Sequence, residues 1–404
     1  MFTKKAPTKT KKGKKILTKL KDDFVEEHGE VPSIVMSGLE EDLEKVDDAV
    51  IITDYTQQDP IAGWVSTNSF MLNAAIGFPI GLGIPMPGMI EVVGTESAGK
   101  SFLLLVLLAN VQRIGGWSAL IDVEETLTHQ FGSLAGLNMH PEAFRYLRMH
   151  LLESCVVAAQ RMFERHVAAA PDMPFAIGID SLASTTVEQE RDNPGEPARA
   201  LHARIMSRAV RRGLLKSFYR TLAMDDSSKI LIPHPVLLVV TNQLKATMNI
   251  IPGMPMLDSF GGRAMKYNSR VRIELTRAGK IQDKDKDPSP VGFRCHARIL
   301  KNKVNQDGRD VAFDFRYASG IEDYFPVLDF MERYDGIEKS GNYYVWDDRK
   351  LYPNAMREFL ISHPREWEKL KQQTLLVMKR VWRDRTIPFV EESVEEEDDD
   401  LVLK

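Results

Sequence analysis

Cysteine is scarce in this sequence, with Cys155 and Cys295 the only two among 404 residues. Neither belongs to a Cys-x-x-Cys pair, which argues against a disulfide framework or a cysteine-ligated zinc site and favours a reducing compartment. Long apolar runs are also missing, since none approaches the roughly 18–20 residues needed to cross a bilayer. The N-terminus lacks the apolar core of a secretory signal. We therefore expect a cytoplasmic protein with no membrane partner.

Charge of neither sign dominates, because the formal net charge is only −4, but its distribution is uneven. Residues 4–21 are strongly basic and residues 391–400 are strongly acidic. Such runs are usually solvated tails. The alternative is a basic arm attracted to polyanions, with an acidic tail that competes with them. Hydrophobic residues make up 43% of the chain, which is enough for the cores of about two or three domains.

The order of patterns along the chain divides it into four parts. We expect a basic arm and an oligomerisation segment in residues 1–62, a large core in residues 63–324, a small α+β domain in residues 325–388 and an acidic tail in residues 389–404. In the first part, Lys15–His28 has apolar residues at helical spacing. The apolar face of that helix must be buried against its own domain or against a neighbouring subunit.

The core alternates between helix and strand patterns, which is typical of an α/β fold with a mostly parallel sheet. The turn-rich stretch Gln282–Pro290 predicts a hairpin loop near its end. The C-terminal domain is expected to be mostly helical, with a short strand at Tyr343–Trp346. Apolar runs predict further strands at Ser118–Ile121, Phe175–Ile179, Val236–Thr241, Val271–Thr276, His296–Leu300 and Val311–Arg316.

The most informative stretch is a phosphate-loop pattern, G-x-x-x-x-G-K-[ST]. A strand is expected before it at Met89–Val93 and a helix after it at Phe102–Val111. In this pattern backbone N–H groups point at phosphate oxygens, the lysine reaches the outer phosphates and the last hydroxyl can hold Mg²⁺. The sequence therefore predicts a nucleoside triphosphate site. Its residues are Gly94, Thr95, Glu96, Ser97, Ala98, Gly99, Lys100 and Ser101.

Three other expected strands end in polar side chains. Asp180 closes an apolar strand as in the Walker B pattern, although a terminal Asp is also common in ordinary strands. Glu124 follows the strand that ends at Ile121 and can orient and deprotonate a water molecule. Gln243 ends the next strand and can sense the outermost phosphate. The stretch Leu244–Ser259 after it has no regular pattern, and so long a stretch inside a compact domain is usually functional or disordered.

A loop rich in proline and glycine, Arg191–Arg199, leads into a helix with a basic face. A solvated face is the usual interpretation of such a stripe. Because no acidic residue interrupts this one, we favour contact with the phosphates of single-stranded DNA. The face carries Arg204, Arg208, Arg211 and Arg212, at positions i, i+4, i+7 and i+8.

Taken together, these motifs resemble the bacterial RecA recombinase family over roughly residues 65–375. The resemblance implies a RecA-like P-loop ATPase core, an N-terminal oligomerisation helix and a small α+β C-terminal domain. It implies a DNA-dependent ATPase that forms a helical filament on single-stranded DNA and pairs it with homologous double-stranded DNA in recombination, repair and the SOS response. Besides the phosphate loop, it rests on Ile121–Glu124, Ala203–Ala209, Thr241–Gln243, Ser259–Tyr267, Lys301–Lys303, Gly341–Lys350 and Trp367–Lys371.

The resemblance also implies roles at the nucleotide. Lys100 and Ser101 would hold the phosphates of ATP and Mg²⁺, and Asp180 would support the metal. Glu124 would activate the attacking water. Phe131 stands where the family places an aromatic residue that stacks on the base, and packing in the core is the alternative.

Further roles concern the neighbouring subunit and DNA. Lys301 and Lys303 would reach the nucleotide of the adjacent subunit, so an isolated subunit would hydrolyse ATP poorly. The second DNA-binding loop would follow Gln243, with Ser259–Tyr267 resembling its end, and Met248 is the residue in it that we favour for wedging between bases. The full set expected to bind DNA is Arg191, Arg199, Arg204, Ser207, Arg208, Arg211, Lys245, Met248, Gly261 and Gly262.

Some positions depart from the family. Ser101 stands where Thr is common and keeps the hydroxyl, Glu125 stands where His is frequent, and Arg263 replaces a small polar residue. Residues 216–234 are longer than the family norm, and we expect them to lengthen the preceding helix and add a surface loop. This insertion and the divergent N-terminal segment are compatible with a phage origin as well as with a bacterial one.

Two other functions remain open on the same core. A ring-forming helicase would need a different N-terminal domain, and Lys301-Asn302-Lys303 and the C-terminal domain disfavour it. A filament scaffold that binds ATP without turnover is disfavoured by the presence of Glu124 and Gln243.

Overall fold

The computed structural model describes residues 61–188, 198–209, 215–223, 229–247, 256–283 and 287–383. The helix expected at Lys15–His28 and the acidic tail lie outside these residues. The chain forms two compact units, one of residues 1–58 and 221–231 and the other of residues 59–220 and 232–404. The second unit contains nearly all of the described residues.

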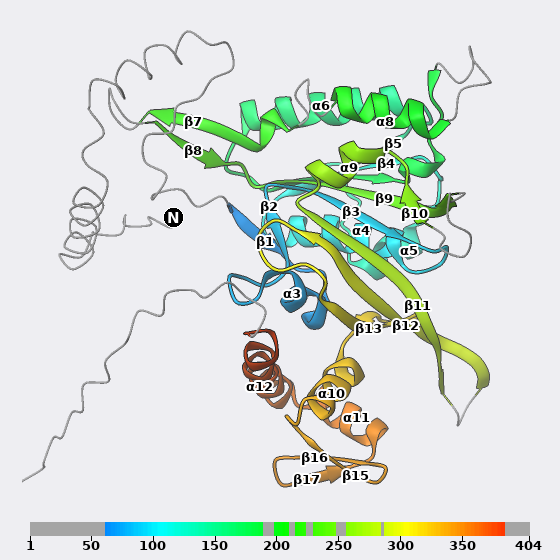
Figure 1. Cartoon of the computed structure of the whole chain (residues 1–404), viewed down its shortest axis with the longest axis vertical. Coiled ribbons are helices and arrows are strands. Elements are labelled where there is room, and N and C mark those ends of the chain that lie inside the picture. Colours follow the sequence, from blue (N-terminus) through cyan, green and yellow to red (C-terminus); the bar gives the residue numbers. More distant parts are fainter. Residues whose placement is uncertain are drawn as a thin grey trace, which may run out of the picture. The chain divides into compact units, whose positions relative to one another are not determined.

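One large sheet organises the second unit (Figure 1). Its strands are β3 (Gly88–Gly94), β4 (Trp117–Asp122), β5 (Phe144–Arg148), β6 (Phe175–Asp180), β9 (Val236–Thr247), β10 (Met256–Ser259), β11 (Val271–Asp283), β12 (Asp287–Asn302), β13 (Asp310–Arg316) and β14 (Gly320–Glu322). Their order is β14-β13-β12-β11-β3-β9-β6-β4-β5, with β10 beside β9. The strands from β11 to β5 are parallel to one another, whereas β10, β12, β13 and β14 pair antiparallel. The α/β fold with a mostly parallel sheet is therefore confirmed.

Helices cover both faces of this sheet (Figure 1). One face packs against α3 (Phe70–Gly77), α4 (Lys100–Arg113) and α5 (His129–Ala135), and the other against α6 (Leu152–Ala169), α8 (Ala198–Ala209) and α9 (Gly262–Asn268). Successive side chains of β9 alternate between the two cores, with Leu237 and Val239 in the first and Leu238 and Val240 in the second. A parallel strand buried on both faces needs apolar residues at every position, which explains the continuous apolar runs in the sequence.

Smaller elements complete the second unit. Strands β1 (Gly63–Val65) and β2 (Ile84–Met86) form a two-stranded sheet. After β14 come α10 (Tyr324–Arg333), the strands β15 (Glu338–Ser340), β16 (Tyr343–Trp346) and β17 (Arg349–Leu351), α11 (Pro353–Ser362) and α12 (Pro364–Arg383). Strand β16 confirms the one strand expected in the C-terminal domain. Among the helices that the structure describes, none combines the length and the apolar composition needed to cross a membrane.

The hairpin expected at Gln282–Pro290 is confirmed, because β11 and β12 pair antiparallel. Its loop is shorter than expected, since the two strands remain paired as far as Asp283 and Asp287. The expectation of a longer helix is wrong, because the described part of the insertion at 216–234 contains no α-helix. The insertion holds a short 3₁₀ turn and then β7 (Tyr219–Ala223) and β8 (Lys229–Pro233), which form their own two-stranded sheet. Thr and Ile residues in these strands, with turn formers between them, favour a hairpin over a helix.

A buried carboxylate stabilises the start of α3. Asp323 accepts hydrogen bonds from Ser69 Oγ (2.9 Å), the Met71 amide (3.3 Å) and the Phe70 amide. Burial raises the pKa of Asp323 to about 7, although the three donors favour the charged form. This carboxylate therefore joins the helix to the segment just before α10.

Replacing Asp323 by Ala leaves buried N–H groups of α3 without an acceptor. We expect the free energy of unfolding, measured by urea titration, to fall by about 2–4 kcal/mol. Asp348→Ala is the control, because Asp348 is exposed and surface changes of this kind have little effect on stability. Equal losses in the two variants would contradict the structural role of Asp323.

Candidate functional site

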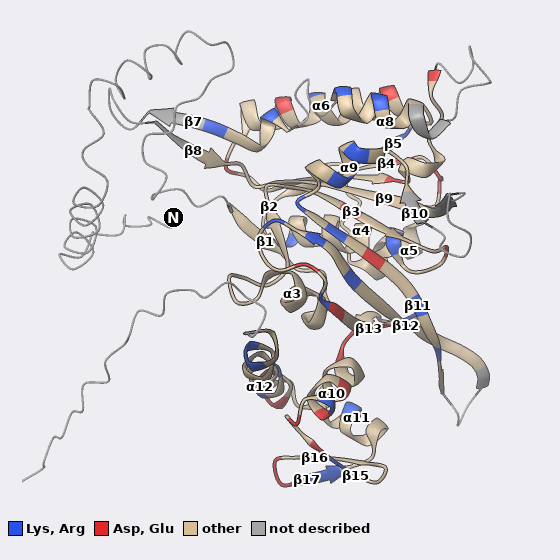
Figure 2. Ribbon diagram, in the orientation of Figure 1, with Lys and Arg blue, Asp and Glu red and all other residues tan. Residues whose placement is uncertain are grey.

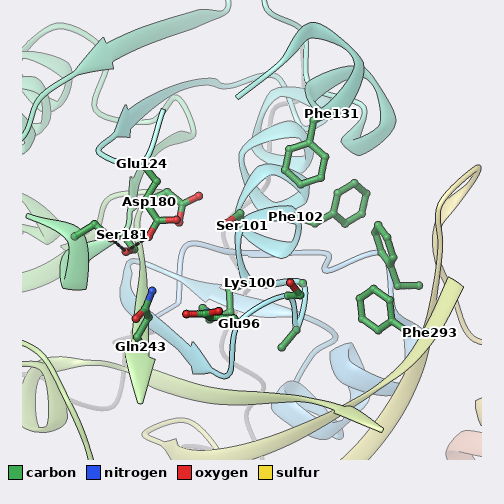
Figure 3. A pocket seen from close by; sticks show the side chains of 15 residues that line it. Glu96, Lys100, Ser101, Phe102, Glu124, Phe131, Asp180, Ser181, Gln243 and Phe293 are labelled. Atoms are coloured by element: carbon green, nitrogen blue, oxygen red, sulfur yellow. Dashed lines mark hydrogen bonds between the residues drawn. The ribbon is translucent and has the colours of Figure 1, made fainter. Parts of the chain in front are cut away.

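The carboxyl ends of β3, β4, β6 and β9 surround one cavity of about 510 Å³ (Figure 3). Open parallel sheets commonly bind ligands at this edge. The cavity brings together residues that the sequence predicted from separate motifs, namely Glu96–Ser101 of the phosphate loop with Glu124, Phe131, Asp180 and Gln243. The first two residues of the loop, Gly94 and Thr95, are not part of the lining. The cavity is lined by Glu96, Ser97, Ala98, Gly99, Lys100, Ser101, Phe102, Glu124, Phe131, Asp180, Ser181, Ser184, Gln243, Phe293 and Phe315.

The phosphate loop connects β3 to α4, and two of its residues must be glycine. Gly94 has a φ of 154°, and a Cβ there would lie 2.1 Å from the carbonyl oxygen of Leu275 on β11. Gly99 precedes α4 in the left-handed conformation, with a φ of 92°, and no side chain caps the helix there. The first N–H groups of α4 are therefore available at the cavity, where the helix dipole favours an anion.

The ammonium group of Lys100 is the cation of the phosphate loop and lies at the N-terminal end of α4. Lys100 Nζ donates hydrogen bonds to the carbonyl oxygens of Gly94 (3.2 Å) and Thr95 (2.7 Å). Burial lowers the pKa of Lys100, while the carboxylates of Asp180 and Glu124 oppose that shift. The ammonium is thus only partly hydrated and can exchange its carbonyl partners for a phosphate oxygen.

Asp180 is almost fully buried at the end of β6, with 4% of its surface exposed. It accepts hydrogen bonds from Thr241 Oγ1 (2.5 Å) and from the Ser101 hydroxyl. Burial raises the pKa of Asp180, and these two bonds oppose the rise. A carboxylate beside a hydroxyl at a phosphate loop is the kind of oxygen donor set that Mg²⁺ prefers.

Glu124 is held at the cavity by two serine hydroxyls. Its Oε1 accepts hydrogen bonds from Ser181 Oγ (2.5 Å) and Ser184 Oγ (2.7 Å), and its amide donates to the Asp180 carbonyl (3.2 Å). Ser184 belongs to a 3₁₀ turn, η2 (Leu182–Ser184), that directly follows β6. The sequence analysis assigned no role to either serine. The signal that could have identified them is a pair of serines, three residues apart, that begins directly after a strand-ending Asp.

An aromatic wall faces the carboxylates across the cavity (Figure 3). Phe102 lies 5.6 Å from Phe131 and 4.7 Å from Phe315 between ring centroids, and Phe293 lies 5.1 Å from Phe315. Phe131 both lines the cavity and packs against the core, so its two expected roles are compatible. The sequence did not indicate that Phe102, Phe293 or Phe315 lines the site. For Phe293 and Phe315 the reason is that they come from β12 and β13, at the antiparallel edge of the sheet.

Gln243 lies beside the phosphate loop, since it pairs with Gly94 in the register of β3 and β9. Strand β9 continues beyond it to Thr247, which pairs with Met256 at the start of β10. The stretch Leu244–Ser259 therefore begins and ends as an antiparallel ladder, which corrects the expectation of irregular structure. Backbone pairing needs no side-chain pattern, so the sequence could not show it.

Lys301 and Lys303 do not reach this cavity. They lie at the end of β12, which runs antiparallel to β11. Val271, the first residue of β11, pairs with Asn302 of β12 and with Ile90 near the start of β3. The two lysines are therefore at the edge of the sheet where the parallel strands begin. Measured along β3, this edge lies about four residues, or about 13 Å, from Gly94 at the cavity.

The end of β12 is also connected to α9. Lys301 Nζ donates hydrogen bonds to the carbonyl oxygens of Lys266 (2.5 Å) and Tyr267 (2.7 Å) in the last turn of that helix. Burial lowers the pKa of Lys301, and the neighbouring charges of Lys303 and Arg272 lower it further. A cation at a helix C-terminus is favoured by the helix dipole.

Helix α8 carries the first two arginines of the predicted stripe (Figure 2). Arg204 and Arg208 are exposed, Ser207 is half-buried, and Leu201 and Met206 are buried in the core below. Among the other residues expected to bind DNA, Arg191, Arg211 and Met248 lie outside the described residues, as does Arg212 of the same stripe. The backbone positions of Arg199 in α8 and Lys245 in β9 are described.

Gly261 and Gly262 form a close contact between α8 and α9. Their φ values are 82° and 55°, in the left-handed region. A Cβ at Gly261 would lie 2.5 Å from Met265 Cγ, and one at Gly262 would lie 2.8 Å from Ala203 Cβ. Both positions therefore require glycine for packing, a reason that the sequence alone did not reveal.

Comparison with known proteins agrees with this architecture. The model of the RecA N-terminal domain matches residues 38–322. Protein RecA of Chlamydia abortus is 31% identical over 316 residues, which cover 78% of this chain and 82% of that protein. Protein RecA of Rickettsia conorii is 28% identical over 333 residues, covering 80% and 87%, and that of Paracoccus denitrificans is 29% identical over 311 residues, covering 76% and 79%. With a phosphate loop, strand-end carboxylates and Gln243 at one cavity of a mostly parallel sheet, the chain belongs to the RecA family.

Proposed function

We propose that this protein is a DNA-dependent ATPase that assembles into a helical filament on single-stranded DNA. In that form it would pair the bound strand with homologous double-stranded DNA and exchange strands during recombination and repair. The observation that carries the proposal is the register of Gln243 with Gly94. Strand β9 passes the cavity at Gln243 and continues to Thr247, where it pairs with β10. One continuous strand therefore joins the nucleotide site to a segment that would bind DNA.

The described residues fit ATP and Mg²⁺. The phosphate loop and Lys100 would bind the phosphates, and Ser101 with Asp180 would hold the metal ion. When bound, Mg²⁺ neutralises charge on the phosphate oxygens. Glu124 would orient and deprotonate the attacking water. The Phe131 ring would stack on the base, because stacking needs only a flat apolar face.

The position of Lys301 and Lys303 supports assembly. Both lie at the edge of the sheet opposite their own cavity, so a nucleotide that they contact would have to belong to another subunit. A cation supplied in trans stabilises charge that spreads over the transferring phosphoryl group. Head-to-tail contacts of this kind generate open helical filaments when they do not close into rings.

The DNA contacts would come from α8, from the segments next to α8 and from the segment that follows β9. Arg204 and Arg208 are exposed four residues apart on one face, which suits the phosphates of a single strand. Ser207 lies between them. The packing of Gly261 and Gly262 favours a role in anchoring the second loop on α8, through which these glycines would influence DNA binding. Lys245 and Met248 would supply the charge and the apolar contact of that loop.

The test is to measure ATP hydrolysis with and without single-stranded DNA, together with the formation of joint molecules from homologous DNA. We expect DNA to stimulate turnover and joint molecules to form with ATP present. Stimulated turnover without pairing would favour a helicase, and DNA binding without turnover would favour a scaffold. Either result would contradict the proposal.

Removing the serine hydroxyls that hold Glu124 should slow turnover without weakening substrate binding. In the Ser181→Ala/Ser184→Ala variant, we expect kcat to fall about 10-fold, because a general base that is free to rotate spends little time in the productive orientation. KM should change by less than about threefold. Steady-state phosphate release measures both constants, and a rise in KM at constant kcat would contradict the positioning role.

A further inference from the structure

A buried polar cluster joins three strands of the sheet to the segment that follows β10. Its members are Glu91 on β3, Asn242 on β9, Arg272 on β11 and the backbone carbonyl of Phe260, and we call it the Asn242 cluster. Glu91 and Asn242 are 0% exposed and Arg272 is 9% exposed. Asn242 directly precedes Gln243 but does not line the cavity. Charged and amide groups at this depth are kept in place by their hydrogen bonds.

Every polar group of the Asn242 side chain has a partner. Its Nδ2 donates to Glu91 Oε1 (2.9 Å) and to the Phe260 carbonyl (2.8 Å), and its Oδ1 accepts from the Gln243 amide (3.0 Å). The other carboxylate oxygen of Glu91 accepts from Arg272 Nε (2.5 Å). One side chain therefore contacts the β3 carboxylate, the residue at the cavity and the end of the second loop.

Phe260 is held from the other side by α8. Its ring meets the His202 ring edge-on, with centroids 5.4 Å apart. His202 Nε2 lies 2.9 Å from both Thr185 Oγ1 and the Thr185 carbonyl oxygen, in the segment that follows η2. Phe260 and the two glycines after it thus lie between β9, which carries Gln243, and α8, which carries Arg204 and Arg208.

We propose that Asn242 is a positioning residue that couples nucleotide binding to DNA binding. This inference rests on the proposed function. We expect a shift of β9 at Gln243 to carry Phe260 with it, because separating the Asn242 amide from the Phe260 carbonyl would break a buried hydrogen bond. Phe260 then transmits the shift to α8 and to the end of the second loop. The coupling is reciprocal, so DNA binding affects the nucleotide site in the same proportion.

The test measures the dissociation constant of a labelled oligo-dT strand, by fluorescence anisotropy, with and without a non-hydrolysable ATP analogue. The ratio of the two constants is the coupling factor. We expect the wild-type protein to give a factor of about 10 or more. Asn242→Ala should bring it to within about twofold of one, while the affinity for the analogue without DNA stays within about threefold of wild type.

A matched double variant separates coupling from stability. Glu91→Gln/Asn242→Asp keeps the net charge of the cluster, and the new amide at position 91 can donate to the new carboxylate at position 242. That carboxylate cannot donate to the Phe260 carbonyl. We expect the double variant to be more heat-stable than Asn242→Asp alone but still uncoupled. It also keeps the test decisive if Asn242→Ala does not fold.

Different outcomes overturn different statements. A wild-type coupling factor near one would overturn the proposed function, and the inference with it. A coupled wild type together with an equally coupled Asn242→Ala would overturn the inference alone. Recovery of coupling together with stability in the double variant would also overturn it, because the cluster would then act on stability only.

Discussion

Glu124→Gln is expected to reduce DNA-stimulated ATP turnover by about 100- to 10,000-fold, which is the usual contribution of a general base. The amide that replaces the carboxylate can still bond to Ser181 and Ser184, but it cannot take a proton from water. The phosphate loop is unchanged, so the affinity for a non-hydrolysable ATP analogue should stay within about threefold of wild type. Phosphate release and equilibrium binding of the analogue measure the two effects.

The adjacent residue provides a matched control. Glu125 also carries an exposed carboxylate, which is paired with Arg148 and lies 3.6 Å from His150 Nε2, and it does not line the cavity. Glu125→Gln should therefore retain turnover within about threefold of wild type. A Glu124→Gln variant that turns over as fast as Glu125→Gln would show that the base lies elsewhere.

Mixing two inactive variants is expected to restore ATP turnover. Lys100→Ala damages the cavity of its own subunit, whereas Lys301→Ala/Lys303→Ala damages the edge that would face a neighbour. Each variant alone should lose at least about 100-fold in DNA-stimulated turnover. In an equimolar mixture, about one quarter of head-to-tail junctions combine an intact cavity with intact lysines, so about one quarter of wild-type turnover should return.

A second mixture is the control for this experiment. Lys100 and Glu124 line the same cavity, so mixing Lys100→Ala with Glu124→Gln creates no complete junction. Turnover in that mixture should remain at the level of the separate variants. Recovery in both mixtures, or in neither, would contradict a nucleotide site shared between subunits.

The large elements of this fold could be read from the sequence because each rests on a local pattern. The strand before the phosphate loop and the helix after it were predicted within a few residues of β3 and α4. The same holds for β16, a short strand among helices. The paired ends of the second loop were missed, because their pairing depends on backbone contacts between segments without alternating side chains. The β7–β8 hairpin was missed although its Thr and Ile residues and the turn formers between the strands are a local signal for it.

For the site, the sequence by itself determined which chemical groups are present. The glycines, Lys100 and Ser101 follow a spacing that the geometry of phosphate binding imposes on one short stretch of chain. The carboxylates Asp180 and Glu124 could be placed at the sheet edge because the carboxyl ends of parallel strands lie together.

Only the tertiary structure decided which of these groups face one another. Strand β3 lies between β9 and β11, and this order sets Gln243 beside Gly94 and brings Asn242 and Arg272 to Glu91, more than 100 residues away in the chain. The reversal of β12 sends Lys301 and Lys303 to the opposite edge. Strand order and direction depend on the packing of the whole core, so no local pattern of residues records them.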